Sequence, residues 1–108
     1  MASTVIETYK NDKLYDIQFT LKDSNDAAFD LTGVTLFFRA QKLGTSTLKV
    51  NGTMSIVNPT AGACKYTVQV NDFDAVGDYY AEIEIQFAGG RILTLGDIVI
   101  KVKHELPR

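Results

Sequence analysis

Nucleophilic catalysis would require a cysteine or serine beside a base, and the sequence offers one cysteine and one histidine. Cys64 falls on the apolar face of a predicted strand, whereas His104 lies near the C-terminus. A free cysteine in such a position usually behaves as a small buried hydrophobic residue. We therefore expect Cys64 to be structural, with a Cys–His pair as the alternative.

Two groups of aspartate and asparagine side chains carry the oxygen atoms that calcium prefers. They are Asp72, Asp74 and Asp78, and Asp23, Asn25 and Asp26. An EF-hand loop needs Asp or Asn at its fifth position, where the first group has Val76 and the second has Ala27. Both groups match the Asx turns that join strands. The sequence therefore predicts turns and no metal site, with calcium bound between loops as the alternative.

Glu82 and Glu84 are separated by one residue on a predicted strand, so their carboxylates lie on the same face. Glycosidases use two carboxylates about 5–10 Å apart in a cleft. A solvated strand face explains this pair at least as well, and no neighbouring pattern predicts a cleft. Gly89 and Gly90 are not followed by a helix, so they indicate a hairpin turn and not a phosphate loop. We predict no catalytic residue, no cofactor-binding residue and no enzyme activity.

The composition is that of a globular domain. The chain has 108 residues, of which 45% are hydrophobic and 22% charged, and this predicts one domain over residues 1–108. The formal net charge of -2 provides no basic surface for nucleic acid or for an anionic membrane. No apolar run approaches the roughly 20 residues that span a bilayer. The N-terminus lacks the basic and apolar regions of a signal peptide, so we expect synthesis in the cytoplasm.

Apolar and polar residues alternate with a period of two along most of the chain, which is typical of strands buried on one face. The predicted strands are residues 4–9, 15–22, 34–41, 48–50, 53–57, 63–70, 79–87 and 91–103, the last with a bulge at Gly96. Turns are predicted at residues 11–13, 23–26, 51–52, 58–62 and 89–90. In the first strand, Val5 is expected to face inward.

This pattern predicts an all-β fold. The expected architecture is a single immunoglobulin-like antiparallel β-sandwich of seven to nine strands, with a closed barrel as the alternative. One cysteine excludes an intramolecular disulfide. We expect the core to span residues 13–103 and residues 104–108 to form a tail.

Residues 72–90 contain the clearest predicted strand and the corner that leads into it. Asp74 and Gly77 precede Tyr79 at the start of this strand, an order similar to the tyrosine corner of immunoglobulin-like sandwiches. We therefore assign structural roles to Asp74, Gly77 and Tyr79, with the Tyr79 ring in the core.

Three apolar residues fall on strand faces that should be solvated: Phe37, Tyr80 and Val99. Exposed apolar patches tend to mark partner surfaces, so these residues are the predicted partner interface. The alternative is a local contact between neighbouring strands. A second alternative for the function is a module that binds carbohydrate or a host surface, with four aromatic candidates for stacking on sugars: Phe37, Phe73, Tyr9 and Tyr80.

The order of motifs resembles the N-terminal immunoglobulin-like domain of bacteriophage upper baseplate proteins and related small phage virion domains. The likeness runs from about residue 13 to residue 103. It is carried by residues 15–23 (YDIQFTLKD), 29–38 (FDLTGVTLFF), 62–68 (GACKYTV) and 72–90, with the spacing Asp-x(4)-Gly-x-Tyr followed by a glycine turn.

The resemblance implies a non-enzymatic virion protein that acts by protein–protein docking. It implies a place in the baseplate, tail, neck or head decoration, and synthesis in the host cytoplasm. The implied partners are other virion proteins and further copies of the same chain in a homo-oligomer. Neither nucleic acid nor membrane is an expected partner.

Overall fold

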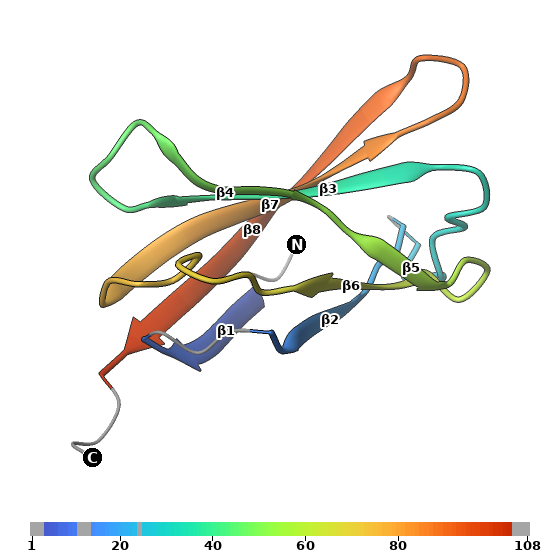
Figure 1. Cartoon of the computed structure of the whole chain (residues 1–108). Helices are drawn as coiled ribbons and strands as arrows, with labels where there is room; N and C mark the ends of the chain where they lie inside the picture. The colour runs from blue at the N-terminus through green and yellow to red at the C-terminus, as the bar shows by residue number, and fades with distance from the viewer. Residues whose placement is uncertain (1–3, 11–13, 24, 105–108) are drawn as a thin grey trace.

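The computed structural model describes residues 4–10, 14–23 and 25–104, and it is an all-β structure with two packed sheets (Figure 1). Its strands are β1 (Thr4–Tyr9), β2 (Asp16–Thr20), β3 (Thr35–Lys42), β4 (Leu48–Thr53), β5 (Ser55–Asn58), β6 (Ala63–Thr67), β7 (Gly77–Gln86) and β8 (Ile92–Lys103). Within the described residues, no helix is long and apolar enough to cross a membrane. The predicted two-sheet β-sandwich is confirmed. The predicted turn at 11–13 and the tail after residue 104 lie outside the described residues.

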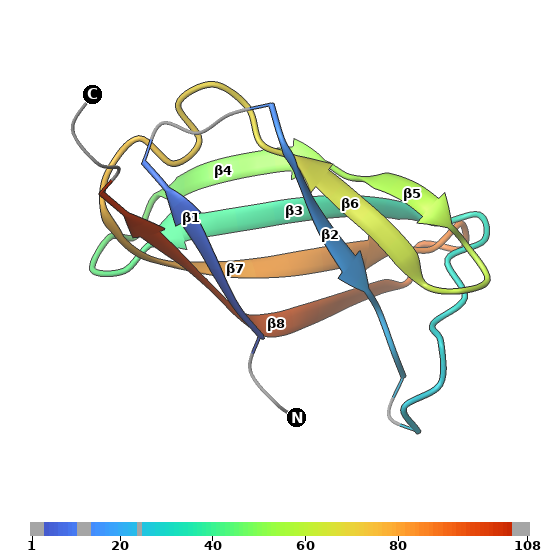
Figure 2. The same cartoon turned by 90° about the horizontal axis from the view of Figure 1, so that it is seen from below.

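The larger sheet has the strand order β1-β8-β7-β3-β4, and the smaller sheet has the order β2-β6-β5. Figure 2 shows the smaller sheet passing in front of the larger one. All paired strands are antiparallel except β1 and β8, which are parallel. The prediction of a wholly antiparallel sandwich is therefore wrong for this pair. A tight turn between two strands forces them to be antiparallel. No such turn joins β1 to β8, because β1 is followed in the chain by β2 of the other sheet.

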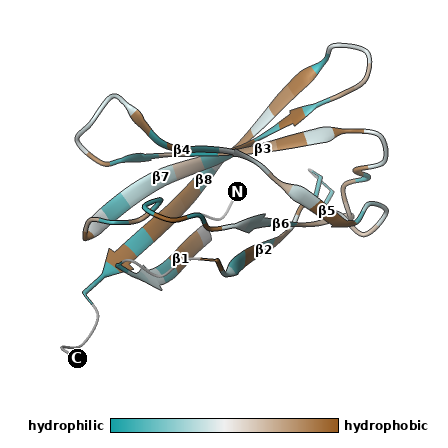
Figure 3. Ribbon diagram, in the orientation of Figure 1, coloured by the Kyte–Doolittle hydropathy of each residue, from teal (hydrophilic) through white to brown (hydrophobic). Residues whose placement is uncertain are grey.

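The core lies between the sheets and is made by the inward positions of each strand. Figure 3 shows the resulting alternation of hydrophobic and hydrophilic bands along the larger sheet. Phe38 of β3 stacks on Tyr66 of β6 with ring centroids 4.7 Å apart, and Phe19 of β2 lies 5.9 Å from Phe38 on the same side. These three rings join the two sheets across the sandwich.

The Asn51-Gly52 pair does not form the predicted hairpin turn. Asn51 pairs with Arg39 and Gly52 with Phe38, so β4 continues through both residues before the chain crosses to β5. A Cβ on Gly52 would lie 2.9 Å from the Tyr66 ring. Glycine is therefore needed here because an aromatic ring packs against the backbone, and not because the chain turns.

The first strand has the opposite facing from the one predicted. Ile6 packs against the core and Thr8 is buried, whereas Val5 is 54% exposed. The Thr8 hydroxyl is hydrogen-bonded to the hydroxyl of Tyr15, which makes its burial acceptable. Because side chains alternate with a period of two, burial of Ile6 and Thr8 forces Val5 outward.

The β7–β8 hairpin closes as predicted. The amide of Gly90 donates to the Phe87 carbonyl at 3.0 Å, and the amide of Phe87 donates to the Arg91 carbonyl at 2.8 Å. The pairing shifts between Ala81 and Ile83, which leaves one extra residue on β8 at the predicted Gly96 bulge. Because of this extra residue, inward side chains of β7 are opposite inward side chains of β8 both before and after the bulge.

Candidate functional site

A row of apolar side chains crosses the outer face of the larger sheet, which is the face turned away from the smaller sheet. The strand register places Val5 opposite Val99, Val99 opposite Tyr80, Tyr80 opposite Gln41, and Gln41 opposite Leu48. Val5, Tyr80 and Leu48 are 54%, 55% and 47% exposed. We call Val5, Val99, Tyr80 and Leu48, with Gln41 between them, the apolar row. It runs through all five strands.

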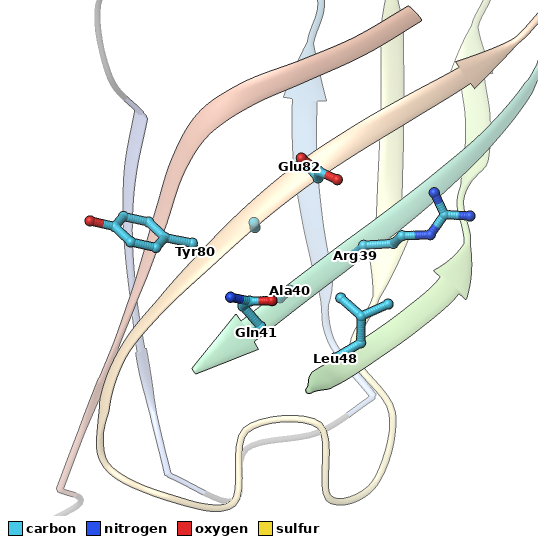
Figure 4. A pocket seen from close by; sticks show the side chains of 7 residues that line it. Arg39, Ala40, Gln41, Leu48, Tyr80 and Glu82 are labelled. Carbon is cyan, nitrogen blue, oxygen red and sulfur yellow. The ribbon is translucent and has the colours of Figure 1, made fainter. Parts of the chain in front are cut away.

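A shallow hollow of about 240 Å³ lies beside the apolar row on the same face. Its floor is the backbone of β3 and β7 at Ala40 and Ala81, and its rim is formed by the side chains of Arg39, Gln41, Leu48, Tyr80 and Glu82. Figure 4 shows Tyr80 and Glu82 on β7 at one side and Arg39 and Leu48 at the other, with Gln41 between them. The side chains of Ala40 and Ala81 point inward and are buried in the core, so the backbone at these two residues lies between the outward side chains of the rim.

Arg39 is held by partners outside the hollow. Its Nη1 donates to Glu84 at 2.6 Å, its Nε donates to Asn51 at 3.2 Å, and its guanidinium lies 5.5 Å from the Phe37 ring centroid. The hydrogen bond from Arg39, followed by one from Gln86, lowers the pKa of the Glu84 carboxyl. The carboxylate of Glu84 therefore already neutralises the positive charge of Arg39 within the domain.

Glu82 differs from Glu84 in its surroundings. Within the described part of the chain, Glu82 makes no hydrogen bond and no ion pair, and its side chain stands at the rim of the hollow. The two carboxylates that the sequence placed on one strand face thus have different roles. Glu84 joins β7 to β3 through Arg39, and Glu82 presents a charge to the solvent.

The structure brings together two of the three residues of the predicted interface. Tyr80 and Val99 are directly opposite each other on β7 and β8. Phe37 lies instead opposite Glu84 and Thr53, and the guanidinium over its ring covers it in part. Phe37 is therefore in a separate local contact, which was the alternative for this residue.

The sequence reasoning missed Val5, Leu48 and Gln41. Val5 and Ile6 are both apolar, and either can begin the alternation. The short predicted strand 48–50 does not define a facing for Leu48. Glu7 and Tyr9 lie on the same strand face as Val5, and their polar atoms favour the solvent. They are the sequence signal that indicates an outward Val5.

The predicted corner is organised around Tyr79. Its hydroxyl donates to the Ala75 carbonyl at 2.9 Å, and its buried ring meets the Phe73 ring edge-on at 5.2 Å. Asp74 forms an ion pair with Lys49 of β4 at 3.1 Å. Gly77 has a φ of 142°, a conformation that glycine adopts far more readily than other residues. Burial raises the pKa of the Tyr79 hydroxyl.

The structure excludes Phe73 as a residue that stacks on sugars. Phe73 is 1% exposed and packs against Tyr79, so no sugar can reach its face. Tyr80 and Tyr9 are exposed, but they stand on different strands with β8 between them. The four aromatics therefore do not form one stacking surface.

One aspartate of each acidic group accepts hydrogen bonds from backbone amides of its own turn. Asp72 accepts hydrogen bonds from the Tyr66 hydroxyl at 2.5 Å and from the Gln69 amide at 2.8 Å. Asp23 accepts from the amides of Asn25 and Ala27 at 2.9 and 3.1 Å. No group of three or more metal-ligating side chains is found among the described residues. Asp23 and Asp72 therefore hold backbone amides of the turns in which they lie.

Cys64 is buried in β6, and burial raises the pKa of its thiol to about 11. His104 is exposed and follows the end of β8. A thiol that is protonated and closed off from solvent is not a nucleophile. Cys64 therefore serves as a core residue.

The sequence profile of the BppU N-terminal domain matches residues 1–106. The chain belongs to the BppU N-terminal domain family. The resemblance to phage upper baseplate proteins is thereby confirmed. Membership indicates a structural domain of a phage baseplate, and with it a place in the virion among other virion proteins.

A solved structure supports the fold assignment for this BppU N-terminal domain. CopC from Methylosinus trichosporium OB3b superposes with a TM-score of 0.57 at 11% sequence identity, and the match covers 99% of this chain and 90% of that one. At this identity the likeness concerns the β-fold alone. A search of curated proteins found no match.

Proposed function

We propose that the protein is a non-enzymatic structural component of a phage baseplate and that it docks on another virion protein through the apolar row. The family supplies the baseplate setting. The observation that carries the docking surface is the row itself, in which four apolar residues, Val5, Val99, Tyr80 and Leu48, lie on one face on β1, β8, β7 and β4, with Gln41 of β3 between Tyr80 and Leu48. When a partner covers such a row, each Å² of apolar area removed from water contributes about 25 cal/mol to the binding free energy.

The sheet beneath the row makes the surface rigid. The central strands of the sheet, β8, β7 and β3, each pair with a strand on both sides, and the core fills their inner face. A partner therefore meets a preformed surface and does not have to order it on binding. We further propose that several copies are held in the particle as a homo-oligomer, and that the chain is made in the host cytoplasm.

Assembly of variant chains into phage particles tests this function. We expect Leu48→Ser combined with Tyr80→Ser to lose incorporation into purified particles, as measured by mass spectrometry of the particle proteins. Val57→Ser is the matched control, since Val57 is 58% exposed on β5 of the smaller sheet, and it should assemble like the wild type. Equal incorporation of both variants would refute the docking surface. Absence of the wild-type chain from particles would refute the virion role.

A further inference from the structure

We infer that the hollow beside the apolar row binds a cationic side chain, lysine or arginine, presented by the virion protein on which the domain docks. This inference rests on the proposed function and names the chemistry of the partner. It starts from the polar atoms at the rim of the hollow, which are Glu82, Gln41 and Arg39.

Two of these groups offer hydrogen-bond acceptors. Gln41 donates through Nε2 to the Thr45 carbonyl at 3.1 Å, which fixes its amide and leaves Oε1 as an acceptor. Glu82 carries a carboxylate that makes no hydrogen bond or ion pair in the described part of the chain. A guest that carries several N–H donors and a positive charge satisfies both groups at once.

The third group does not favour an anion. Arg39 already donates to Glu84 and Asn51 and lies against the Phe37 ring. A carboxylate or phosphate in the hollow would meet this balanced guanidinium and the unpaired charge of Glu82. Like charges disfavour that arrangement, so charge complementarity selects a cation.

The rest of the hollow suits the stem of a long side chain. Leu48 and Tyr80 form the apolar parts of the rim, and the backbone at Ala40 and Ala81 lies between them. Lysine and arginine bury their methylene stems along such surfaces while their charged ends reach polar groups. The volume of about 240 Å³ holds one side chain, so the partner supplies a single anchor residue while its neighbours cover the apolar row.

Titration of the full ¹⁵N-labelled chain with Nα-acetyl-arginine methylamide tests this site by amide chemical shifts. We expect saturable shifts at residues 39–41, 48 and 80–82, and none with the neutral citrulline analogue. Glu82→Gln should weaken the apparent affinity roughly 2- to 5-fold, as expected for one exposed ion pair. Asp78→Asn is the control, because Asp78 is exposed two residues before Tyr80 on β7, and it should leave the affinity unchanged.

Three results would overturn the inference. They are equal shifts with citrulline, an unchanged affinity in Glu82→Gln, and an equal loss in Asp78→Asn. The docking function has a separate readout in particle incorporation. If Leu48→Ser with Tyr80→Ser blocks incorporation while the arginine probe causes no saturable shift, docking stands and the cation site is wrong. If the probe binds as expected but incorporation is unaffected, the site exists and the docking function is wrong.

Discussion

Replacement of Tyr79 perturbs the one residue that both fills the core and closes the corner before β7. The ring is 1% exposed, it meets Phe73 edge-on at 5.2 Å, and its hydroxyl donates to the Ala75 carbonyl at 2.9 Å. Tyr79→Ala removes the ring and leaves a cavity between the sheets. Buried aromatic residues replaced by alanine typically cost about 3–5 kcal/mol of unfolding free energy.

The hydroxyl and the ring can be separated by a second variant. Tyr79→Phe keeps the ring and its contact with Phe73 but removes the hydrogen bond to Ala75. The net contribution of one such bond is about 0.5–1.5 kcal/mol. Most of the loss in Tyr79→Ala should therefore come from the ring, with a smaller share from the hydroxyl.

Equilibrium unfolding in urea measures these changes, because the midpoint falls with stability when the slope is unchanged. For a domain of this size, about 3 kcal/mol also lowers Tm by more than roughly 12 °C. Tyr80→Ala is the control on the neighbouring residue, since Tyr80 is 55% exposed, and it should change stability by less than about 0.5 kcal/mol. A loss below about 1 kcal/mol in Tyr79→Ala, or an equal loss in Tyr80→Ala, would refute the role of Tyr79 as the anchor of the corner.

Two further stability predictions follow from Gly62 and Cys64. Gly62→Ala should cost several kcal/mol in urea unfolding or prevent folding, because its φ is 71° and a Cβ would lie 2.4 Å from the Leu21 carbonyl oxygen. Gly44→Ala, with a φ of 89° and open space around it, should cost only about 1–2 kcal/mol, and equal losses would contradict the steric explanation. Burial raises the Cys64 pKa to about 11 from an ordinary value near 9.0, so between these pH values the unfolded chain loses a proton that the folded chain keeps. The free energy of unfolding should therefore fall as pH rises. Between pH 8 and pH 10.5 this fall should be about 2 kcal/mol larger in the wild type than in Cys64→Ala, as measured by urea unfolding at both pH values. An equal fall in both proteins would contradict burial of a neutral thiol.

Much of the architecture follows from local pattern. The alternation in β7 places Tyr79, Ala81, Ile83 and Ile85 inward, and the structure buries all four. The Gly89-Gly90 turn and the irregularity at Gly96 were also predictable, because glycine marks positions where a hairpin turns or a strand bulges.

The predictions failed where local pattern is ambiguous or where a distant residue decides. Val5 and Ile6 are both apolar, so their own types do not decide which of them faces inward; in the structure Ile6 packs against the core and Thr8, on the same face, contacts Tyr15. Asn51-Gly52 has the composition of a turn, but Tyr66 from the other sheet occupies the space beside Gly52. Neither contact is visible in the neighbouring sequence.

The sequence by itself determined the β class, most inward faces and, through its motif order, membership of the BppU N-terminal domain family. Only the tertiary structure decided which outward residues meet. Val5, Tyr80 and Leu48 are far apart in the chain, and they share one row because β1, β7 and β4 are placed in one sheet with a defined register. Register between distant strands is set by packing of the buried faces, so the candidate docking surface is a consequence of the core that lies beneath it.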